Sequence, residues 1–331
     1  MTAPAKPELH TPEHPVRFVT ASALFDGHDA SINIMRRIMQ SQGAEVIHLG
    51  HNRSVQEVVD TAIDEDVQGV AVSSYQGGHV EYFEYLTQLL REQGAGHVKV
   101  FGGGGGVIVP EEIQRLRDAG VTIFSPEDGQ RLGLPGMINT LIAECDVDVW
   151  EQAPVTLEPV LAGERAAIAR AISGAELGHL DQTFLDGIAE AAARSSAPVL
   201  GLTGTGGSGK SSLTDELVRR FRVDQQDKLR VAVIAVDPTR RKGGGALLGD
   251  RIRMNSLGES SSGVSPVFFR SLATRGDREV PDALQTVIDI TKAAGYDLVI
   301  VETPGIGQGD AAIIPFVDVP MYVMTPEFGA A

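Results

Sequence analysis

The sequence predicts an α/β protein of two domains, each built on a parallel β-sheet with helices on both faces. Short apolar runs alternate with amphipathic stretches of helical length, which is the pattern of parallel strands joined by crossover helices. The alternation occurs in two blocks, separated by a strand-free stretch over residues 147–196. A length of 331 residues, 42% of them hydrophobic, is sufficient for two buried cores.

The first block begins at residue 16. Residues 1–15 hold four prolines and few apolar side chains, so we expect a disordered tail there. Apolar runs then predict buried strands at residues 16–21, 45–49, 69–74, 98–102 and 121–124. The predicted helices cover residues 29–42, 54–65, 79–93, 110–119 and 129–144. Residues 16–146 should therefore form a first domain, which binds its ligand beyond the carboxyl ends of the strands.

The second block follows a segment without strand-like runs. Residues 147–196 contain two Ala-rich helical stretches, which form either a linker or the opening helices of the next domain. Apolar runs then predict strands at residues 197–205, 229–236, 265–269, 296–303 and 319–325, and helices are predicted at 209–222 and 281–294. Residues 197–331 should form the second domain, in which residues 237–264 make a long functional loop with a short helical middle.

Composition and charge exclude several classes of protein. The formal net charge of −16 argues against a nucleic-acid or anionic-membrane partner, because such partners require a basic surface. The single cysteine, Cys145, excludes an internal disulfide and a multi-cysteine metal cluster. No apolar run is long enough to span a membrane and the first residues lack a secretory signal, so we expect a cytoplasmic protein.

Three polar residues follow the first predicted strand, at the edge of the sheet where ligands bind. His28 can offer a neutral imidazole to a metal, and Asp26 is close enough to accept a hydrogen bond from its other ring nitrogen. The alternative is an exposed loop histidine, with Asp29 as the N-cap of the next helix.

Two glycine-containing loops lie at the same edge. The sequence SSYQGGH follows the third predicted strand, and five glycines, Gly102–Gly106, follow the fourth. Glycine weakens regular structure, so a run of this length indicates a place where a bulky group lies against bare backbone. Ser73 places a short hydroxyl beside that space. These loops favour a slot for a large ligand whose metal or base is contacted by His28.

These segments together resemble the D-x-H-x-x-G, S-x-L and G-G signature of cobalamin-binding domains, which have a flavodoxin-like (Rossmann-like) fold. The resemblance covers about residues 16–145. It implies that His28 is the lower axial cobalt ligand and Asp26 its hydrogen-bond partner. It also implies that the benzimidazole tail is contacted by residues of the two loops, namely Ser73, Tyr75, Gly105 and Gly106. Ser31 and Tyr75 stand where the signature has Gly and Leu.

The second domain opens with a phosphate-binding sequence. The stretch GTGGSGKSS matches G-x-x-x-x-G-K-[ST] and lies between a predicted strand and a predicted helix. Backbone N–H groups of such a loop hold phosphates, Lys210 neutralises them and Ser211 ligates magnesium. The alternative is a Gly-rich turn before an ordinary helix. The predicted nucleotide-binding residues of the loop are Gly204, Gly207, Ser208, Gly209, Lys210, Ser211 and Ser212.

Two carboxylates at strand ends are candidates for further magnesium ligands. Asp237 ends the predicted strand 229–236, and Glu302 lies at the end of the predicted strand that begins at residue 296. The sequence Glu302-Thr-Pro-Gly305 resembles a GTPase switch loop in which the Gly305 N–H senses a γ-phosphate. The alternative for each acid is a solvated loop charge.

The segments 236–255 and 302–310 resemble the metallochaperone GTPases that service adenosylcobalamin-dependent acyl-CoA mutases. By that resemblance the bound nucleotide is GTP and Arg253 contacts it. The resemblance adds magnesium ligands around the two carboxylates, and the complete set is Ser211, Val236, Asp237, Asp250, Glu302 and Thr303.

The order of the two domains resembles the family of fused isobutyryl-CoA mutases. In that family the same polypeptide adds an acyl-CoA-binding barrel, isobutyryl-CoA and n-butyryl-CoA are interconverted by a radical rearrangement, and GTP hydrolysis gates cofactor loading and protection. The resemblance implies a multifunctional isomerase with a chaperone GTPase, adenosylcobalamin, GTP and magnesium as cofactors, and a homodimeric full-length form. The barrel would be supplied by the same polypeptide or by a partner subunit.

The chain stops at Ala331 without the guanine-reading N-K-x-D pattern and without length for a barrel of about 250 residues. We therefore expect an incomplete GTPase sheet, and either a fragment of the fused enzyme or a truncated product. Two alternatives stay open. One is a stand-alone cobalamin carrier or sensor with a nucleotide-driven switch, and the other is a P-loop ATPase that binds no cobalamin.

Overall fold

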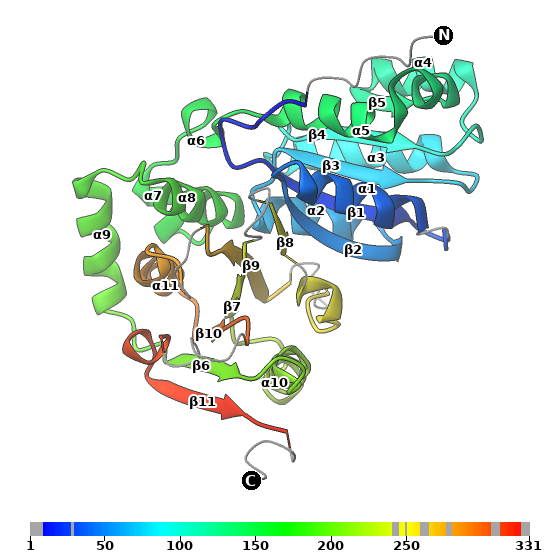
Figure 1. The fold of residues 1–331 in the computed structure, drawn as a ribbon. Coiled ribbons are helices and arrows are strands. Elements are labelled where there is room, and N and C mark those ends of the chain that lie inside the picture. The colour runs from blue at the N-terminus through cyan, green and yellow to red at the C-terminus, as the bar shows by residue number, and fades with distance from the viewer. Residues whose placement is uncertain are drawn as a thin grey trace. The chain divides into compact units, whose positions relative to one another are not determined.

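The computed structural model divides the chain into two compact units, and each combines segments that are distant in sequence (Figure 1). Unit 1 comprises Met1–Ala62, Val67–Asp148 and Arg240–Leu247. Unit 2 comprises Ile63–Asp66, Val149–Thr239 and Leu248–Ala331. The structure describes residues 9–27, 30–239, 245–248, 250–258, 265–275, 280–305 and 312–325. Residues 63–66 thus belong to unit 2 although both flanking stretches belong to unit 1, and residues 240–247 belong to unit 1 although both flanking stretches belong to unit 2.

Unit 1 contains a sheet with the strand order β5-β4-β3-β1-β2-β8. The pairs from β5 to β2 are all parallel, as predicted. The strand order reverses beside β1, and ligands of such sheets bind at this kind of switch point. There the register places Ser22 of β1 opposite Ser73 of β3. The strands are β1 (Arg17–Ala23), β2 (Glu45–Arg53), β3 (Gly69–Ser73), β4 (Lys99–Gly103), β5 (Val121–Phe124) and β8 (Ala246–Leu248).

Five helices connect or follow the first five strands. They are α1 (Ala30–Ser41), α2 (Val55–Asp64), α3 (His79–Glu92), α4 (Pro110–Asp118) and α5 (Pro126–Cys145). Helix α5 begins three residues before its predicted start, because Ser125 caps the Asp128 N–H and a proline occupies the first helical position. It bends at Gly133, whose φ of 64° and ψ of 168° are not helical.

One core cluster of unit 1 lies between its sheet and the helices α1 and α5. Phe18 and Phe101 pack with their ring centroids 6.3 Å apart, and Met39 and Ile142 are fully buried against them. This packing seats both helices on the sheet beside the strand ends that form the candidate site.

Residues 10–14 of the amino-terminal segment form hydrogen bonds with the rest of unit 1. Asp146 accepts hydrogen bonds from the backbone N–H groups of Glu13 and His14, both at 2.9 Å, and lies 2.7 Å from His10 Nε2. Asn139 accepts from the His10 N–H. The tail that the proline content predicted over residues 1–15 is therefore tied to unit 1 at residues 10–14, because a buried carboxylate needs these donors.

Unit 2 contains a second parallel sheet with the strand order β11-β6-β10-β7-β9. Its strands are β6 (Val199–Gly204), β7 (Val231–Asp237), β9 (Val267–Ala273), β10 (Leu298–Glu302) and β11 (Val319–Val323). Strands β6, β7 and β10 end side by side, so the sheet brings the phosphate-loop sequence beside Asp237 and Glu302. The fold class predicted from the alternating pattern is confirmed for both units.

The segment predicted as a linker or opening helices forms helices of unit 2. Ile168 and Ile172 on α8 are fully buried in the same core as Val299 of β10, which shows that this segment is part of the domain. Two more long helices, over residues 210–224 and 284–293, contact the strands of this sheet. The helices of unit 2 are α6 (Val149–Gln152), α7 (Leu157–Leu161), α8 (Arg165–Leu177), α9 (Gln182–Ala193), α10 (Lys210–Asp224), α11 (Leu284–Ala293), and the short 3-10 turns η1 (Asp250–Arg253) and η2 (Ile314–Phe316).

The region predicted as a long loop contains η1 and strand β8. The predicted helical middle corresponds to η1, whereas β8 was not predicted. Its edge position in the unit 1 sheet is supported by a hydrogen bond from the Ala246 N–H to the Ala44 carbonyl. A strand of three residues leaves little periodicity in the sequence, and its position depends on pairing with a distant segment.

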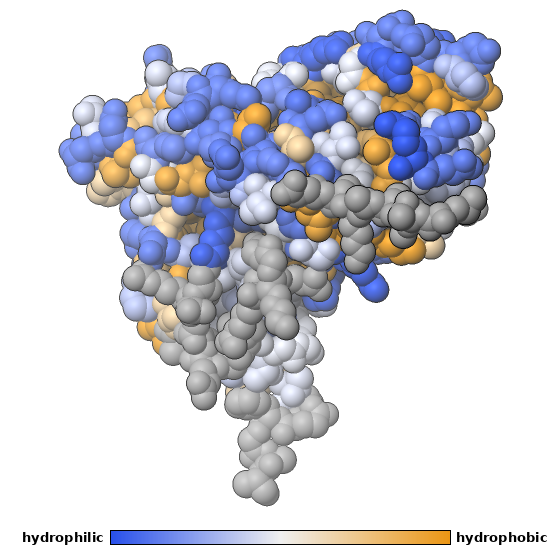
Figure 2. Space-filling model, turned by 45° about the horizontal axis from the view of Figure 1, so that its top comes forward, coloured by the Kyte–Doolittle hydropathy of each residue, from blue (hydrophilic) through white to orange (hydrophobic). Residues whose placement is uncertain are grey.

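Hydrophilic residues cover much of the face drawn in Figure 2, with hydrophobic residues gathered in smaller groups between them. Within the described part of the chain, no helix has both the length and the apolar content that a membrane span requires.

Candidate functional site

A cavity of about 240 Å³ opens in unit 1 among the ends of β3 and β4 and the helices α1 and α5. Its wall is mainly apolar, with Met35 and Met39 from α1, Phe101 from β4, and Met137 and Leu141 from α5. Methionine side chains adapt to irregular ligands. Of the cobalamin residues predicted from the sequence, Ser73, Tyr75 and Gly105 line this cavity.

Several glycines of the run Gly102–Gly106 are required by close packing. A Cβ at Gly102 would lie 2.7 Å from Ile123 and collide with the Phe83 ring. A Cβ at Gly104 would collide with the Ser74 carbonyl oxygen. Gly102 lines the cavity as the glycine run predicted, but packing against Phe83 and Ile123 is a second reason for its lack of a side chain.

Gly102–Gly105 all line the cavity, and two of them, Gly105 and Gly103, differ in the space that a side chain would have. A Cβ at Gly105 would lie 2.6 Å from the Tyr75 ring, so Tyr75 rests on bare backbone at the cavity wall. At Gly103 a Cβ would have only the Phe124 carbonyl oxygen nearby, at 3.7 Å. Gly106 has a φ of 97° and is exposed outside the cavity lining.

Ser73 and Ser31 place hydroxyl groups at the cavity. The Ser73 Oγ is 2.9 Å from the Ser22 Oγ, which fixes the orientation of the Ser73 side chain. The Ser31 Oγ is buried on the cavity wall without a hydrogen-bond partner in the described structure. Buried hydroxyls are normally paired, so this atom fits a ligand that brings a polar group to the wall.

Asp26 lies fully buried directly after β1. Its Oδ2 accepts a hydrogen bond of 2.5 Å from the Tyr75 N–H, and its carbonyl accepts from the Asn52 N–H. The carboxylate therefore joins the loops that follow β1 and β3, and the second of these loops holds Tyr75. His28, the predicted cobalt ligand, lies outside the described residues.

A second pocket of about 300 Å³ lies in unit 2 where β6 runs into α10. Its wall is polar and brings together most of the residues predicted for the nucleotide and magnesium. The lining residues are Gly206, Gly207, Gly209, Lys210, Ser211, Ser212, Asp237, Pro238, Arg253, Glu302, Thr303 and Pro304.

The phosphate loop depends on glycines in left-handed backbone conformations. Gly207 and Gly209 have φ values of 79° and 91°, which other residues rarely adopt. Lys210 folds back and donates hydrogen bonds to the carbonyls of Gly204 and Thr205, at 2.9 and 3.1 Å. Gly305 has a φ of 70°, and a Cβ there would collide with the Lys210 ammonium group.

Ser211 and Glu302 bring oxygen donors together on the pocket wall. The Ser211 Oγ donates to Glu302 Oε1 at 2.7 Å, and the Thr214 Oγ1 donates to Glu302 Oε2 at 2.8 Å. Asp237 lies at the same wall and is 7% exposed. Hydroxyl and carboxylate oxygens are the ligands that magnesium prefers, so the donor set fits that ion.

For the other residues predicted to bind the nucleotide or magnesium, the structure gives weaker support for a contact with the pocket. Thr303 lines the pocket, but its hydroxyl donates to the Thr203 Oγ1 at 3.0 Å. Val236 is buried within β7 and does not line the pocket. The Ser208 Oγ is buried without a hydrogen-bond partner in the described structure. The backbone of Asp250 lies in η1, but its side chain is outside what the structure describes.

The structure adds Thr214, which was not predicted for the nucleotide pocket, and the pocket wall also includes the unpredicted residues Gly206, Pro238 and Pro304. Thr214 lies four residues after Lys210 on α10 and therefore on the same helical face, where it anchors the second oxygen of Glu302. The spacing was visible in the sequence, but a threonine inside a helix is common without such a role. Among the described residues, no group of three or more His, Cys, Asp or Glu side chains forms a metal site of its own.

Each of the two units matches a known protein family. Residues 16–130 match the B12 binding domain family, and residues 168–331 match the family described as methylmalonyl Co-A mutase-associated GTPase MeaB. The first range contains the strand ends and loops that line the apolar cavity, and the second contains the phosphate loop with its oxygen donors. The two resemblances drawn from the sequence are thus confirmed at the level of the domain.

Sequence similarity to known proteins covers both domains. The chain is 72% identical over 98% of its length to a fused isobutyryl-CoA mutase of Nocardia farcinica, and 62% identical over 100% of its length to one of Cupriavidus metallidurans. A third, from Geobacillus kaustophilus, is 58% identical over 97% of the chain. The chain spans 30% of the length of each of these curated relatives. It therefore carries a B12-binding domain and a MeaB-type GTPase domain, and is homologous over its whole length to fused isobutyryl-CoA mutases.

Proposed function

We propose that this chain is the cofactor-handling part of an adenosylcobalamin-dependent acyl-CoA mutase that interconverts isobutyryl-CoA and n-butyryl-CoA. The observation that carries the proposal is the apolar, glycine-bordered cavity at the switch point of the unit 1 sheet. Its place and lining suit a large, mostly apolar group with few polar atoms. The homology to fused isobutyryl-CoA mutases supports the choice of reaction.

In this proposal His28 is the lower axial ligand of cobalt, and Asp26 orients it. One oxygen of Asp26 is bonded to the Tyr75 N–H, and the carboxylate is buried next to the loop that carries His28. A carboxylate that binds the second ring nitrogen would fix the tautomer of the imidazole. Ser73, Tyr75, Gly105 and Gly106 would border the tail of the cofactor. When bound, adenosylcobalamin supplies the radical that starts the carbon-skeleton rearrangement.

The phosphate-loop pocket would bind GTP with magnesium. Lys210 would neutralise the phosphates, while the backbone N–H groups of the loop from Gly204 to Ser212 would hold their oxygens. Ser211, Asp237 and Glu302 would hold magnesium, with Asp250, Val236 and Thr303 as further candidates. Arg253, on the same pocket wall, would contact the nucleotide, and Gly305 would sense its terminal phosphate.

GTP hydrolysis in this unit would gate the loading and protection of the cofactor, as befits a MeaB-type domain. The acyl-CoA site would come from a mutase barrel, in the same polypeptide or in a partner subunit, and the full-length form would be a homodimer. The chain's share of 30% of the length of its relatives supports the presence of such a further part in those proteins.

An absorption spectrum of the purified chain mixed with adenosylcobalamin tests the first site. We expect the wild-type protein to give a base-off, histidine-ligated spectrum that is lost in His28→Ala. His51→Ala is the control, because His51 is an exposed histidine of the same unit. If the folded wild-type chain does not bind the cofactor, or if His28→Ala keeps the wild-type spectrum, the proposed cobalamin role is wrong.

A titration with fluorescent GTP and ATP analogues tests the second site. We expect magnesium-dependent binding of the GTP analogue, its loss in Lys210→Ala, and weaker binding of the ATP analogue. Equal binding of both nucleotides would contradict the choice of GTP and leave a general phosphate-loop site.

A further inference from the structure

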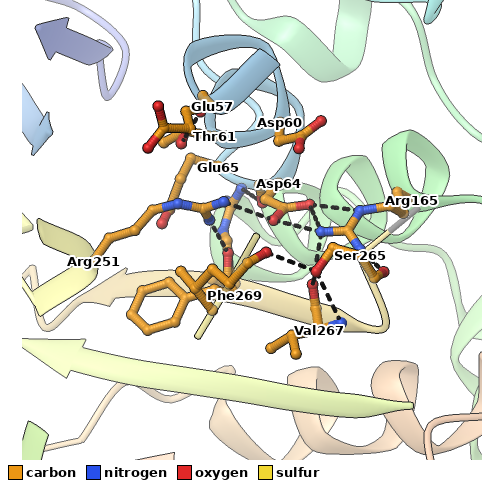
Figure 3. Close-up of polar contacts among 12 residues, drawn as sticks. Glu57, Asp60, Thr61, Asp64, Glu65, Arg165, Arg251, Ser265, Val267 and Phe269 are labelled. Atoms are coloured by element: carbon orange, nitrogen blue, oxygen red, sulfur yellow. Dashed lines mark hydrogen bonds and ion pairs between the residues drawn. The ribbon is translucent and has the colours of Figure 1, made fainter. Parts of the chain in front are cut away.

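A buried carboxylate in unit 2, Asp64, holds two arginine side chains from different elements (Figure 3). Asp64 is fully buried. Arg165 donates from Nε and Nη2 to Oδ1, at 3.0 and 2.7 Å, and from Nη2 to Oδ2 at 2.7 Å. Arg251 donates from Nη2 to Oδ2 at 3.1 Å. One negative charge is therefore shared by two buried or partly buried guanidinium groups.

The two arginines are anchored unequally apart from Asp64. Arg165 donates to the carbonyls of Ser265 and Val267, at 3.1 and 2.9 Å. Arg251 donates to the Phe269 carbonyl at 2.9 Å, and its guanidinium carbon lies 5.5 Å from the centre of the Phe269 ring. If the negative charge were removed, the repulsion between the two cations would move Arg251, because Arg251 donates to one backbone carbonyl whereas Arg165 donates to two.

Arg251 belongs to η1, the turn that reaches the nucleotide pocket. Asp250 precedes Arg251, and Arg253, two residues later, lines the pocket together with Lys210. The segment after the turn is anchored as well, because the Ser256 N–H, three residues after η1, donates a hydrogen bond of 2.8 Å to Asp215 of α10. A displacement of Arg251 would therefore change how η1 presents Arg253 to the phosphate loop.

We propose that Asp64 is a positioning residue of the nucleotide pocket, which acts through Arg251 to fix η1. The inference rests on the proposed nucleotide binding of the phosphate loop. It assigns a role in unit 2 to Asp64, which lies in a segment whose neighbours on both sides belong to unit 1. The nucleotide need not touch Asp64 for its affinity to depend on this carboxylate.

The chain offers a matched control for Asp64. Asp66, two residues later, is also buried and also pairs with an arginine, since Arg170 Nε donates to its two oxygens at 3.0 and 2.8 Å. Arg170 also donates to the carbonyls of Val149 and Ala153, which are distant in sequence from η1. Asp66→Asn thus disrupts a similar buried pair that is not anchored to η1.

The experiment compares Asp64→Asn and Asp66→Asn in the full chain. The dissociation constant of a fluorescent GTP analogue is measured in excess magnesium, and thermal unfolding is recorded in parallel. We expect both variants to lose thermal stability, whereas only Asp64→Asn weakens nucleotide binding, by about tenfold. Unchanged affinity in Asp64→Asn, or an equal loss in Asp66→Asn, overturns the proposal.

A double variant tests the route through Arg251. If Asp64 acts through Arg251, the variant Asp64→Asn/Arg251→Met should bind the analogue as Arg251→Met does, because the two effects share one cause. Losses that multiply would overturn that route. If Asp64→Asn does not fold, Arg251→Lys replaces it, since lysine keeps the charge but not the forked geometry, and wild-type affinity in that variant overturns the proposal.

The wild-type chain separates this inference from the function on which it rests. If the wild-type chain does not bind the GTP analogue, the proposed nucleotide function is wrong. If the wild-type chain binds the analogue and Lys210→Ala does not, the site is established and the Asp64 comparison tests the positioning role alone.

Discussion

Ser211 and Glu302 are 91 residues apart in the chain, yet the Ser211 hydroxyl donates a 2.7 Å hydrogen bond to the Glu302 carboxylate. Parallel strands β6 and β10 are neighbours, so the start of α10 and the end of β10 meet at the same sheet edge. The pair places two oxygen donors where a phosphate loop holds its metal ion.

Glu302→Gln should weaken magnesium-dependent nucleotide binding. The amide keeps the size of the side chain but removes the negative charge that would attract the ion, so we expect a loss of about tenfold, or about 1.4 kcal/mol. The measurement is a titration with a fluorescent GTP analogue in magnesium and in EDTA. Glu190→Gln, at an exposed position on α9, is the control. The same loss in EDTA would contradict a role in binding the metal.

Gly105→Ala should weaken cobalamin binding. The new Cβ would lie 2.6 Å from the Tyr75 ring, at a φ of 56° that strains any other residue. We expect displacement of Tyr75 and an affinity about tenfold lower, measured by absorption titration with adenosylcobalamin. Gly103→Ala is the matched control, because it lies on the same cavity wall and a Cβ there has room. Equal losses in both variants would argue against a specific role for the Tyr75 contact.

Asp146→Asn should destabilise unit 1 at neutral pH. Burial tends to raise the pKa of Asp146, but the N–H groups of Glu13 and His14 together with His10 outweigh it and hold the pKa below its ordinary value. Such a depressed pKa stabilises the folded state above the unfolded pKa of about 3.9, and this contribution is lost as the pH falls through the folded pKa.

The expected loss in Asp146→Asn is about 1.5–3 kcal/mol of unfolding free energy at pH 7, as for hydrogen bonds to a charged group. Urea unfolding at pH 7 and in acid measures it, and the difference from wild type should shrink in acid. Asp118→Asn, on the surface of α4, is the control. A difference that persists unchanged below the folded pKa would contradict this account.

Cys145 should resist alkylation in the native protein. Burial raises the pKa of this thiol to about 12, so little thiolate forms at pH 8. We expect modification by iodoacetamide to be at least about 100-fold slower in buffer than in urea, as followed by mass spectrometry. Because the chain has a single cysteine, the mass shift reports on this residue alone. Rapid modification in buffer would show that the core around Cys145 opens readily.

The sequence predicted the repeating elements well because their signals are local. Strand β5 occupies the same four residues, Val121–Phe124, as its predicted apolar run. The start of α5 at Pro126 could have been read from Ser125, Pro126 and Asp128, which form a capping box with proline at the first position. Strand β8 could not, since three residues carry little pattern and their pairing partner is distant.

The candidate sites likewise contain residues that a local sequence pattern indicates and residues that only the folded chain brings together. The phosphate loop was found from the sequence because its residues are contiguous, and the parallel order of the strands predicted its proximity to Asp237 and Glu302. The role of Gly102 in core packing depends on Phe83 and Ile123, which are near it only in the folded chain. The bond between Asp64 and Arg251 joins residues 187 positions apart, and no local pattern indicates it.

The interleaving of the two units has a consequence for how such a protein can be inherited. A single recombination event between residues 148 and 149 would separate most of each unit, but it would deprive unit 1 of residues 240–247 and unit 2 of residues 63–66. The first fragment would lose strand β8, and the second would retain Arg165 and Arg170 without their carboxylate partners. Once joined, two domains arranged in this way are expected to be passed on together.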